Sequence, residues 1–186
     1  DHVGSLHAFD DGSTQIYANE MTRKELIDPQ KIGEFFDYVW GQPKPVAEVT
    51  IMSDTFSVGD LSFEVVPLPG HAADMVGFYE PEKRWFFSSD AIPLLSKKRI
   101  AMAEENIPLM VTTMEKIRGM DIEILFDSHR GPIDSPREHI QTRIDYINMI
   151  QKEARTLHET GKSIDEIQEA LGLEGPWYLE MTKERF

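Results

Sequence analysis

Apolar residues that alternate with polar ones predict most of the β structure of this chain. Leu61, Phe63 and Val65 alternate with polar residues after a turn at residues 57–60, which predicts a strand with one buried face. Runs rich in β-branched and aromatic residues predict further strands. The strands are expected at residues 46–51, 61–66, 76–79, 84–87 and 122–126.

Other segments carry apolar residues three or four positions apart, which is the spacing of one helical face. Asp28 followed by Pro29 is typical of a helix N-cap and first turn, and Ser135 and Ser163 each begin a sequence typical of a capping box. The helices are expected at residues 29–40, 107–117, 136–157 and 163–171. Strands followed by a helix, a strand and more helices indicate a layered α/β protein.

Composition narrows the classes of function. The 186 residues carry a net charge of -14, which argues against a nucleic acid or an acidic membrane as partner. Lys97-Lys98-Arg99 is the only compact basic cluster, and no apolar run approaches the roughly 20 residues of a membrane helix. The absence of cysteine excludes thiolate ligands and disulfides within these residues, and it fits a cytoplasmic protein without a signal peptide.

Three residues that can bind a metal each follow a predicted strand. His71 follows one strand through a Pro-Leu-Pro-Gly turn, Asp90 follows another through two serines, and His129 follows the last. Each residue alone has an ordinary explanation as a turn residue or helix N-cap. Their recurrence at three strand ends, together with the adjacent pair Asp1-His2, favours a site built at one edge of a sheet.

The other histidines have different surroundings. His139 and His158 lie in the long predicted helix and are expected to be solvated. His7 follows a loop of small residues, where it could end a helix or line a site, and the first interpretation is favoured.

The segments around the strand ends resemble motifs of the metallo-β-lactamase superfamily. Residues 69–79, with Pro-Gly-His, small and polar residues and then a strand, resemble the segment of its third metal-binding motif. Residues 85–90 resemble the strand that ends in a metal-bridging aspartate, although Ser89 stands where many members have glycine. Residues 128–132 resemble the segment of the last metal-binding histidine, and residues 1–5 resemble the end of the motif His-x-His-x-Asp-His.

The resemblance implies an αββα sandwich of the metallo-β-lactamase type that is incomplete at the N-terminus and is followed by a helical C-terminal tail. The metallo-hydrolase domain is expected at residues 1–135, and the C-terminal helices at residues 136–186 are expected to pack on the same domain. Two histidines and several strands that precede Asp1 in this family would belong to a longer parent chain.

The resemblance also implies the ligands of two metal ions. One position would take the two upstream histidines and His71, and the other would take Asp1, His2 and His129. Asp90 would bridge the two ions, and Asp1 would also act as a catalytic residue that orients the nucleophile. Imidazole and carboxylate ligands suit Zn²⁺, with Fe or Mn as alternatives.

The expected function is metal-dependent hydrolysis, in which a metal-bound hydroxide attacks a small ester, thioester or lactone. Two alternatives stay open: an iron-dependent oxidoreductase on the same fold, and a non-catalytic binding module with a degenerate site. The expected partner is a small-molecule substrate, with neither nucleic acid nor membrane. The sequence leaves the substrate, the metal and the oligomeric state open.

Overall fold

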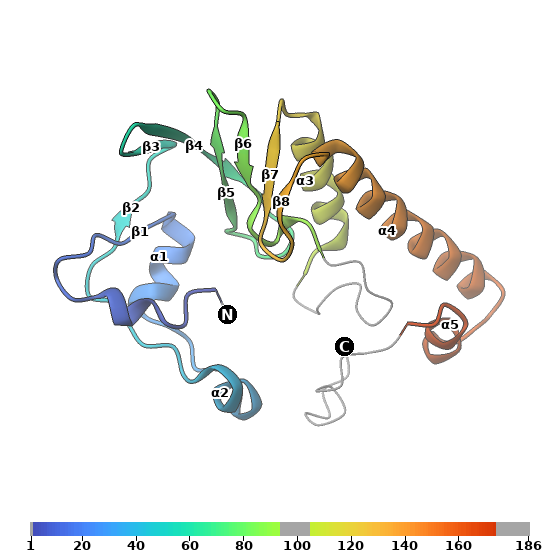
Figure 1. Ribbon diagram of the computed structural model, residues 1–186. Coiled ribbons are helices and arrows are strands. Elements are labelled where there is room, and N and C mark those ends of the chain that lie inside the picture. Colours follow the sequence, from blue (N-terminus) through green and yellow to red (C-terminus); the bar gives the residue numbers. More distant parts are fainter. Residues whose placement is uncertain (1, 94–104, 174–186) are drawn as a thin grey trace. The chain divides into compact units, whose positions relative to one another are not determined.

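The computed structural model of the protein describes residues 2–93 and 105–173 (Figure 1). The predicted ligand Asp1 and the basic triplet Lys97-Lys98-Arg99 lie outside these residues. The chain folds as two compact units, residues 1–56 and residues 57–186. The boundary predicted at residue 135 stays a prediction.

The first unit surrounds a short parallel pair of strands, in which Tyr17 lies opposite Thr50. Its elements are the 3-10 helix η1 (Leu6–Phe9), β1 (Tyr17–Ala18), α1 (Glu20–Ile27), α2 (Glu34–Trp40) and β2 (Thr50–Ile51). Its small core consists of the buried residues Ile16, Ala18, Leu26, Val46 and Val49. Of the strand expected at residues 46–51, only the last two residues form a strand, β2.

The prediction that a helix begins after Asp28 is wrong. Asp28 is the C-cap of α1, a helix that was not predicted, and α2 begins only at Glu34, after its N-cap Gly33. The non-helical conformation favoured before a proline suits the end of a helix as well as an N-cap, and here Asp28 ends α1. The cap of α1 is Asn19, whose side chain accepts hydrogen bonds from two backbone N–H groups of the first turn.

The second unit contains a six-stranded mixed sheet in the order β3-β4-β5-β6-β7-β8, whose first strand begins two residues before the boundary between the units. The strands are β3 (Thr55–Val58), β4 (Leu61–Pro67), β5 (Val76–Glu80), β6 (Trp85–Phe87), β7 (Ile124–Asp127) and β8 (Gly131–Ile133). β5 is antiparallel to both β4 and β6, and β7 is parallel to β6. β4, β6 and β7 therefore run in the same direction, and their carboxyl ends lie at the same edge of the sheet.

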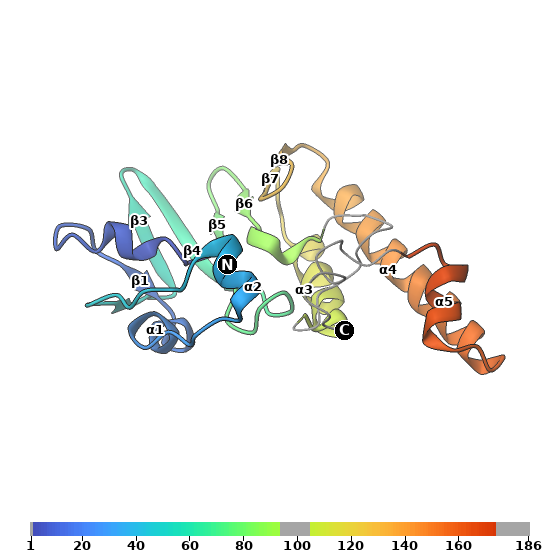
Figure 2. The same cartoon turned by 90° about the horizontal axis from the view of Figure 1, so that it is seen from below.

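Two helices, α3 (Ile107–Gly119) and α4 (Pro136–Glu159), lie side by side over one face of this sheet (Figures 1 and 2). They share one core with the strands. Its buried residues are Val66, Leu68, Phe86, Ala91, Ile92, Met114, Ile117, Leu125, Ile140, Ile144 and Ile147. The first half of α4 thus belongs to the same core as the sheet, and the predicted α/β class with a helical C-terminal region is confirmed.

The two predicted capping boxes have different outcomes. At Ser163, which precedes α5 (Ile164–Ala170), the serine and Glu166 form both reciprocal hydrogen bonds of the box. At Ser135 the side chain makes no cap bond, so that prediction is wrong although α4 begins where expected. Pro136 at the first helical position fixes the start of α4 without the box. No helix within residues 2–93 and 105–173 is long and apolar enough to cross a membrane.

The opposite face of the sheet carries a row of aromatic side chains. The rings of Phe87 and Phe126 are stacked with centroids 4.5 Å apart. The rings of Trp85 and Phe126 pack edge to face with centroids 5.7 Å apart, and those of Phe63 and Phe87 do so at 6.0 Å between centroids. Strand alternation places these side chains opposite the helix-covered face, so both faces of the central strands are apolar.

The turn after β4 requires a glycine. Gly70 has a φ of 145°, and a Cβ atom added there would lie 2.6 Å from Met110 Cγ and 2.8 Å from its Cα. α3 approaches the turn this closely because it is hydrogen-bonded to it: the backbone N–H of Asn106 donates to the Gly70 carbonyl (2.8 Å), and the Thr113 hydroxyl donates to the Pro69 carbonyl (2.6 Å). The turn and the start of α3 therefore form one rigid piece.

We expect Gly70→Ala to lower the free energy of unfolding by about 2 kcal/mol or more, because the added methyl group overlaps Met110. Gly119→Ala is the matched control, since nothing lies within 4 Å of a Cβ at that helical position. It should leave stability unchanged or raise it by up to about 1 kcal/mol. Urea unfolding of both variants tests this, and equal stability of the two would contradict the close packing.

Candidate metal centre

The sheet topology brings together three of the predicted ligands. His71, Asp90 and His129 follow the carboxyl ends of β4, β6 and β7 by a few residues each. Because these strands run in the same direction, the three side chains meet at one edge of the sheet. The recurrence of metal-binding residue types at strand ends is thus explained by the fold.

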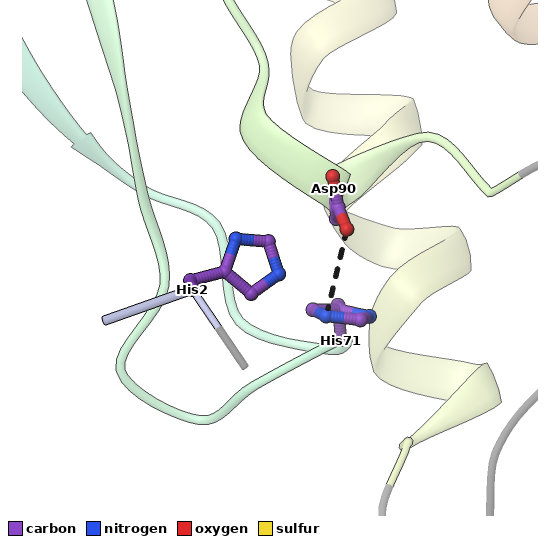
Figure 3. Close-up of side chains that lie close together, drawn as sticks. All are labelled: His2, His71 and Asp90. Atoms are coloured by element: carbon purple, nitrogen blue, oxygen red, sulfur yellow. Dashed lines mark ion pairs between the residues drawn. The ribbon is translucent and has the colours of Figure 1, made fainter. Parts of the chain in front are cut away.

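Asp90 faces both histidines with different oxygens. Its Oδ2 lies 3.8 Å from Nε2 of His71, and its Oδ1 lies 3.4 Å from Nε2 of His129. Figure 3 shows the His71 ring beneath the Asp90 carboxylate, with their ion pair dashed. The His71 and Asp90 side chains are 12% and 15% exposed, whereas His129 is 39% exposed. The centre is therefore mostly enclosed on the His71 side and open to solvent on the His129 side.

This donor set fits metal ions. Two ligand atoms that each lie about 2.0–2.2 Å from one tetrahedral ion are separated by roughly 3.3–3.6 Å. The spacings from Asp90 to His71 and to His129 are close to this range. A carboxylate with one oxygen towards each of two imidazoles has the arrangement of a bridging ligand.

Serines hold Asp90 in place. The Ser128 hydroxyl lies 2.5 Å from Asp90 Oδ1 and 2.9 Å from the Ser89 carbonyl, and these two acceptors share its single proton. Ser88 is fully buried, and its backbone N–H donates to the carbonyl of Phe126 at 3.1 Å. The segments that carry Asp90 and His129 are therefore hydrogen-bonded to each other beyond the ends of their strands.

Ser89 occupies a backbone conformation that favours glycine. Its φ is 47°, in the left-handed region that side chains other than glycine adopt at a cost. In the motif that this segment resembles, the residue before the aspartate is often glycine, and a left-handed φ accounts for that preference. Ser89 adopts this conformation here, and its carbonyl accepts a hydrogen bond from the Ser128 hydroxyl.

The loop of His129 is organised by Asp127, whose side chain is 1% exposed. Asp127 Oδ1 accepts from the backbone N–H groups of His129 (2.9 Å) and Arg130 (3.1 Å). Its Oδ2 accepts from the Arg130 guanidinium at 2.7 Å and lies 3.3 Å from Nε2 of His139 on α4. One buried carboxylate therefore fixes the turn that presents His129.

Asp127, His139 and Glu105 lie around the predicted ligands, which the sequence did not indicate. His139, expected to be solvated, is instead half-buried against Asp127, so that prediction is wrong. Glu105 lies 2.7 Å from Nδ1 of His71. An acidic residue ending a buried strand was a signal for Asp127, but Glu105 is 34 residues from His71 and no local pattern indicates their contact.

The remaining predicted ligands are not brought to this edge by the topology of the second unit. Asp1 lies outside the described residues, and His2, also drawn in Figure 3, belongs to the first unit. Their roles stay predictions from the motif. His7 lies in η1, with its Nδ1 3.3 Å from the Gly4 carbonyl, in agreement with the favoured helix-end interpretation.

The surroundings of His139 change its acidity. Burial lowers the pKa of His139 below its ordinary value of 6.5, and the charges of Arg143 and Arg130 lower it further. The hydrogen bond to Asp127 acts in the opposite direction without cancelling these effects. His139 is therefore more readily neutral in the folded protein than in the unfolded chain.

Comparison with known proteins now identifies the family. A sequence model of the metallo-beta-lactamase superfamily matches residues 1–139. The chain belongs to the metallo-beta-lactamase superfamily. The predicted relationship and the predicted type of α/β fold are thereby confirmed, and the superfamily consists mostly of hydrolytic metalloenzymes.

Several solved structures share this fold. A metallo-beta-lactamase family protein from Thermus thermophilus is 15% identical, with a TM-score of 0.69 over 84% of this chain and 60% of that one. A superfamily protein from Sulfolobus tokodaii is 13% identical, with a TM-score of 0.62 over 78% of this chain and 63% of that one. A third protein, solved in a di-iron-bound form, is 21% identical, with a TM-score of 0.54 over 74% of this chain and 69% of that one. At these identities the likeness shows the fold alone.

A curated relative matches part of the chain. An uncharacterized protein from Aquifex aeolicus (strain VF5) is 31% identical over 97 residues, which are 50% of this chain and 44% of that protein. The chain thus spans less than half the length of this relative.

The lowered pKa of His139 predicts a pH dependence of stability. Below pH 6.5 the unfolded chain binds a proton at His139 that the folded protein resists, so stability should fall as the pH decreases from about 6.5 through the folded pKa. His139→Gln removes this titration but keeps a donor for Asp127. Urea unfolding at pH 7.5 and pH 5.5 should show a smaller loss of stability in the variant than in the unsubstituted protein. Equal losses would show that His139 is not destabilised in its protonated form.

Proposed function

We propose that the complete protein is a metal-dependent hydrolase that acts on a small ester, thioester or lactone. The observation that carries this proposal is Asp90, which faces His71 with one carboxylate oxygen and His129 with the other. Membership in a superfamily of mostly hydrolytic metalloenzymes supports the same class of reaction. The substrate class is the finer part of the proposal, because one fold hosts many reactions.

His71, Asp90 and His129 would hold the metal ions, together with Asp1 and His2 as the motif implies. Two Zn²⁺ ions are the proposed occupants, since nitrogen and oxygen ligands without thiolates suit zinc, and Fe or Mn are alternatives. Metal ions bound there would lower the pKa of a coordinated water and polarise the oxygen of the substrate's carbonyl group.

The surrounding residues would keep the ligands in position. Asp90 supplies the negative charge between the two histidines, and the Ser128 hydroxyl orients its Oδ1. Asp127 fixes the backbone of the His129 turn through two N–H groups. Asp1 is proposed to orient the attacking nucleophile, as the motif implies.

The more exposed histidine indicates the side from which substrate would enter. His129 is 39% exposed, compared with 12% for His71. A small molecule could therefore reach the centre from the side of His129, whereas His71 is covered. A small-molecule partner is consistent with the net charge of -14, which disfavours nucleic acid.

Asp90→Asn is the most direct test of this function. The variant keeps the size of the side chain but removes the charge, so it should lose bound metal and reduce hydrolysis by about a hundredfold or more, because even outer residues of metal sites contribute 10–100-fold. Asp134→Asn is the matched control, because Asp134 is exposed in the turn between β8 and α4. The measurements are metal content by mass spectrometry and hydrolysis of a panel of esters, thioesters and lactones by the full-length protein.

The results separate the proposed function from its alternatives. Zinc in the unsubstituted protein with hydrolysis lost in the Asp90 variant supports the proposal. Tightly bound iron without hydrolysis would favour an oxidoreductase. A protein that contains no metal after purification and takes up none when metal is added would be a binding module. Full hydrolysis by the Asp90 variant would overturn the proposed mechanism.

A further inference from the structure

A buried glutamate contacts the enclosed histidine of the centre. Oε1 of Glu105 lies 2.7 Å from Nδ1 of His71, and the Glu105 side chain is 4% exposed. A carboxylate at this distance accepts a hydrogen bond, so the proton of a neutral His71 ring is placed on Nδ1. The other ring nitrogen, Nε2, is then left with its lone pair, and it is this nitrogen that faces Asp90.

Glu105 is held by the same contacts that hold the His71 turn. It directly precedes Asn106, the N-cap of α3, whose side chain accepts from the Leu109 N–H group at 3.0 Å. The Asn106 N–H group donates to the carbonyl of Gly70, the residue before His71. This backbone hydrogen bond between Asn106 and Gly70 holds the residue next to Glu105 against the residue next to His71.

Burial of this carboxylate needs a reason. A carboxylate removed from water is costly unless hydrogen bonds compensate, and an apolar residue would fill the same space without that cost. One oxygen of Glu105 is within hydrogen-bond distance of a ring nitrogen of a predicted ligand. In metal sites, a carboxylate bonded to the second nitrogen of a histidine ligand fixes the ring orientation and tautomer.

We propose that Glu105 is a positioning residue that orients the His71 ring and keeps its proton on Nδ1, so that Nε2 is presented to the metal. This inference rests on the proposed metal site for its role, but the tautomer of His71 exists with or without metal. Two readouts therefore separate the inference from the proposed function.

The first readout is the His71 tautomer in the metal-free full-length protein. Long-range ¹H–¹⁵N NMR spectra distinguish a ring protonated on Nδ1 from one protonated on Nε2, and His71→Gln identifies the His71 signals by their loss. We expect the Nδ1–H tautomer in the unsubstituted protein and a shift towards Nε2–H in Glu105→Ala. An unchanged tautomer in Glu105→Ala would overturn the inference whatever the protein binds.

The second readout is the affinity for Zn²⁺, measured by competition with a chromophoric chelator. Glu105→Ala should bind Zn²⁺ about 10–100-fold more weakly than the unsubstituted protein. Glu105→Gln keeps an acceptor oxygen without the charge, so it should bind with an affinity between those two. Glu115→Ala removes an exposed carboxylate from α3 and should bind as the unsubstituted protein does.

The variants also separate positioning from a purely structural role. Glu105→Gln is nearly isosteric, so it serves as the test variant if Glu105→Ala does not fold. If Glu105 only filled space, the acceptor oxygen of glutamine would not restore part of the Zn²⁺ affinity that the alanine variant loses. Zn²⁺ bound equally well by the folded Glu105 variants and by the unsubstituted protein would overturn the inference and leave the proposed function intact. A lack of Zn²⁺ binding by the unsubstituted protein would overturn the proposed function, and the tautomer would then decide the role of Glu105.

Discussion

The common direction of three strands is the constraint on which the centre depends. β5 is antiparallel to both of its neighbours, β4 and β6, and β7 is parallel to β6. The carboxyl ends of β4, β6 and β7 therefore share one edge, and residues up to 58 positions apart in the sequence (71 to 129) become neighbours there. The apolar packing on both faces of these strands makes that edge rigid, so short loops are sufficient to place the ligands.

The predicted ligands are held by a layer of polar residues behind them. Glu105 lies behind His71, Ser128 behind Asp90, and Asp127 behind the turn of His129. Two of the three are carboxylates that are almost fully buried. This layer fixes ring and carboxylate orientations that the strands alone would leave free, and it adds negative charge around a centre that would hold cations.

Local sequence patterns predicted what depends on local interactions. The alternation around Leu61–Val65 predicted β4, and the spacing after Ile107 predicted α3. Asp28-Pro29 was wrongly predicted to begin a helix, because the same residue pair can begin or end one. Here the N-cap at Asn19 begins α1, and Asp28 ends it. The strand β8 and the helix α1 were missed because each is short and carries little periodicity.

The site shows the same division. The proximity of His71, Asp90 and His129 could be predicted because each lies a few residues beyond a strand with a clear pattern. Glu105 could not, because its contact with His71 arises only when α3 packs against the turn at Gly70. His139 was expected to be solvated because it lies in the long predicted helix, whereas its environment is set by a buried aspartate 12 residues away.

We propose that Asp90, which lies between His71 and His129, is a ligand of bound metal ions. A crystal structure of the full-length protein with data collected at the zinc absorption edge tests it most directly. We expect anomalous scattering next to Asp90, from zinc that the Asp90 carboxylate would hold together with His71 or His129. Zinc-loaded crystals with no anomalous peak next to Asp90 would contradict it.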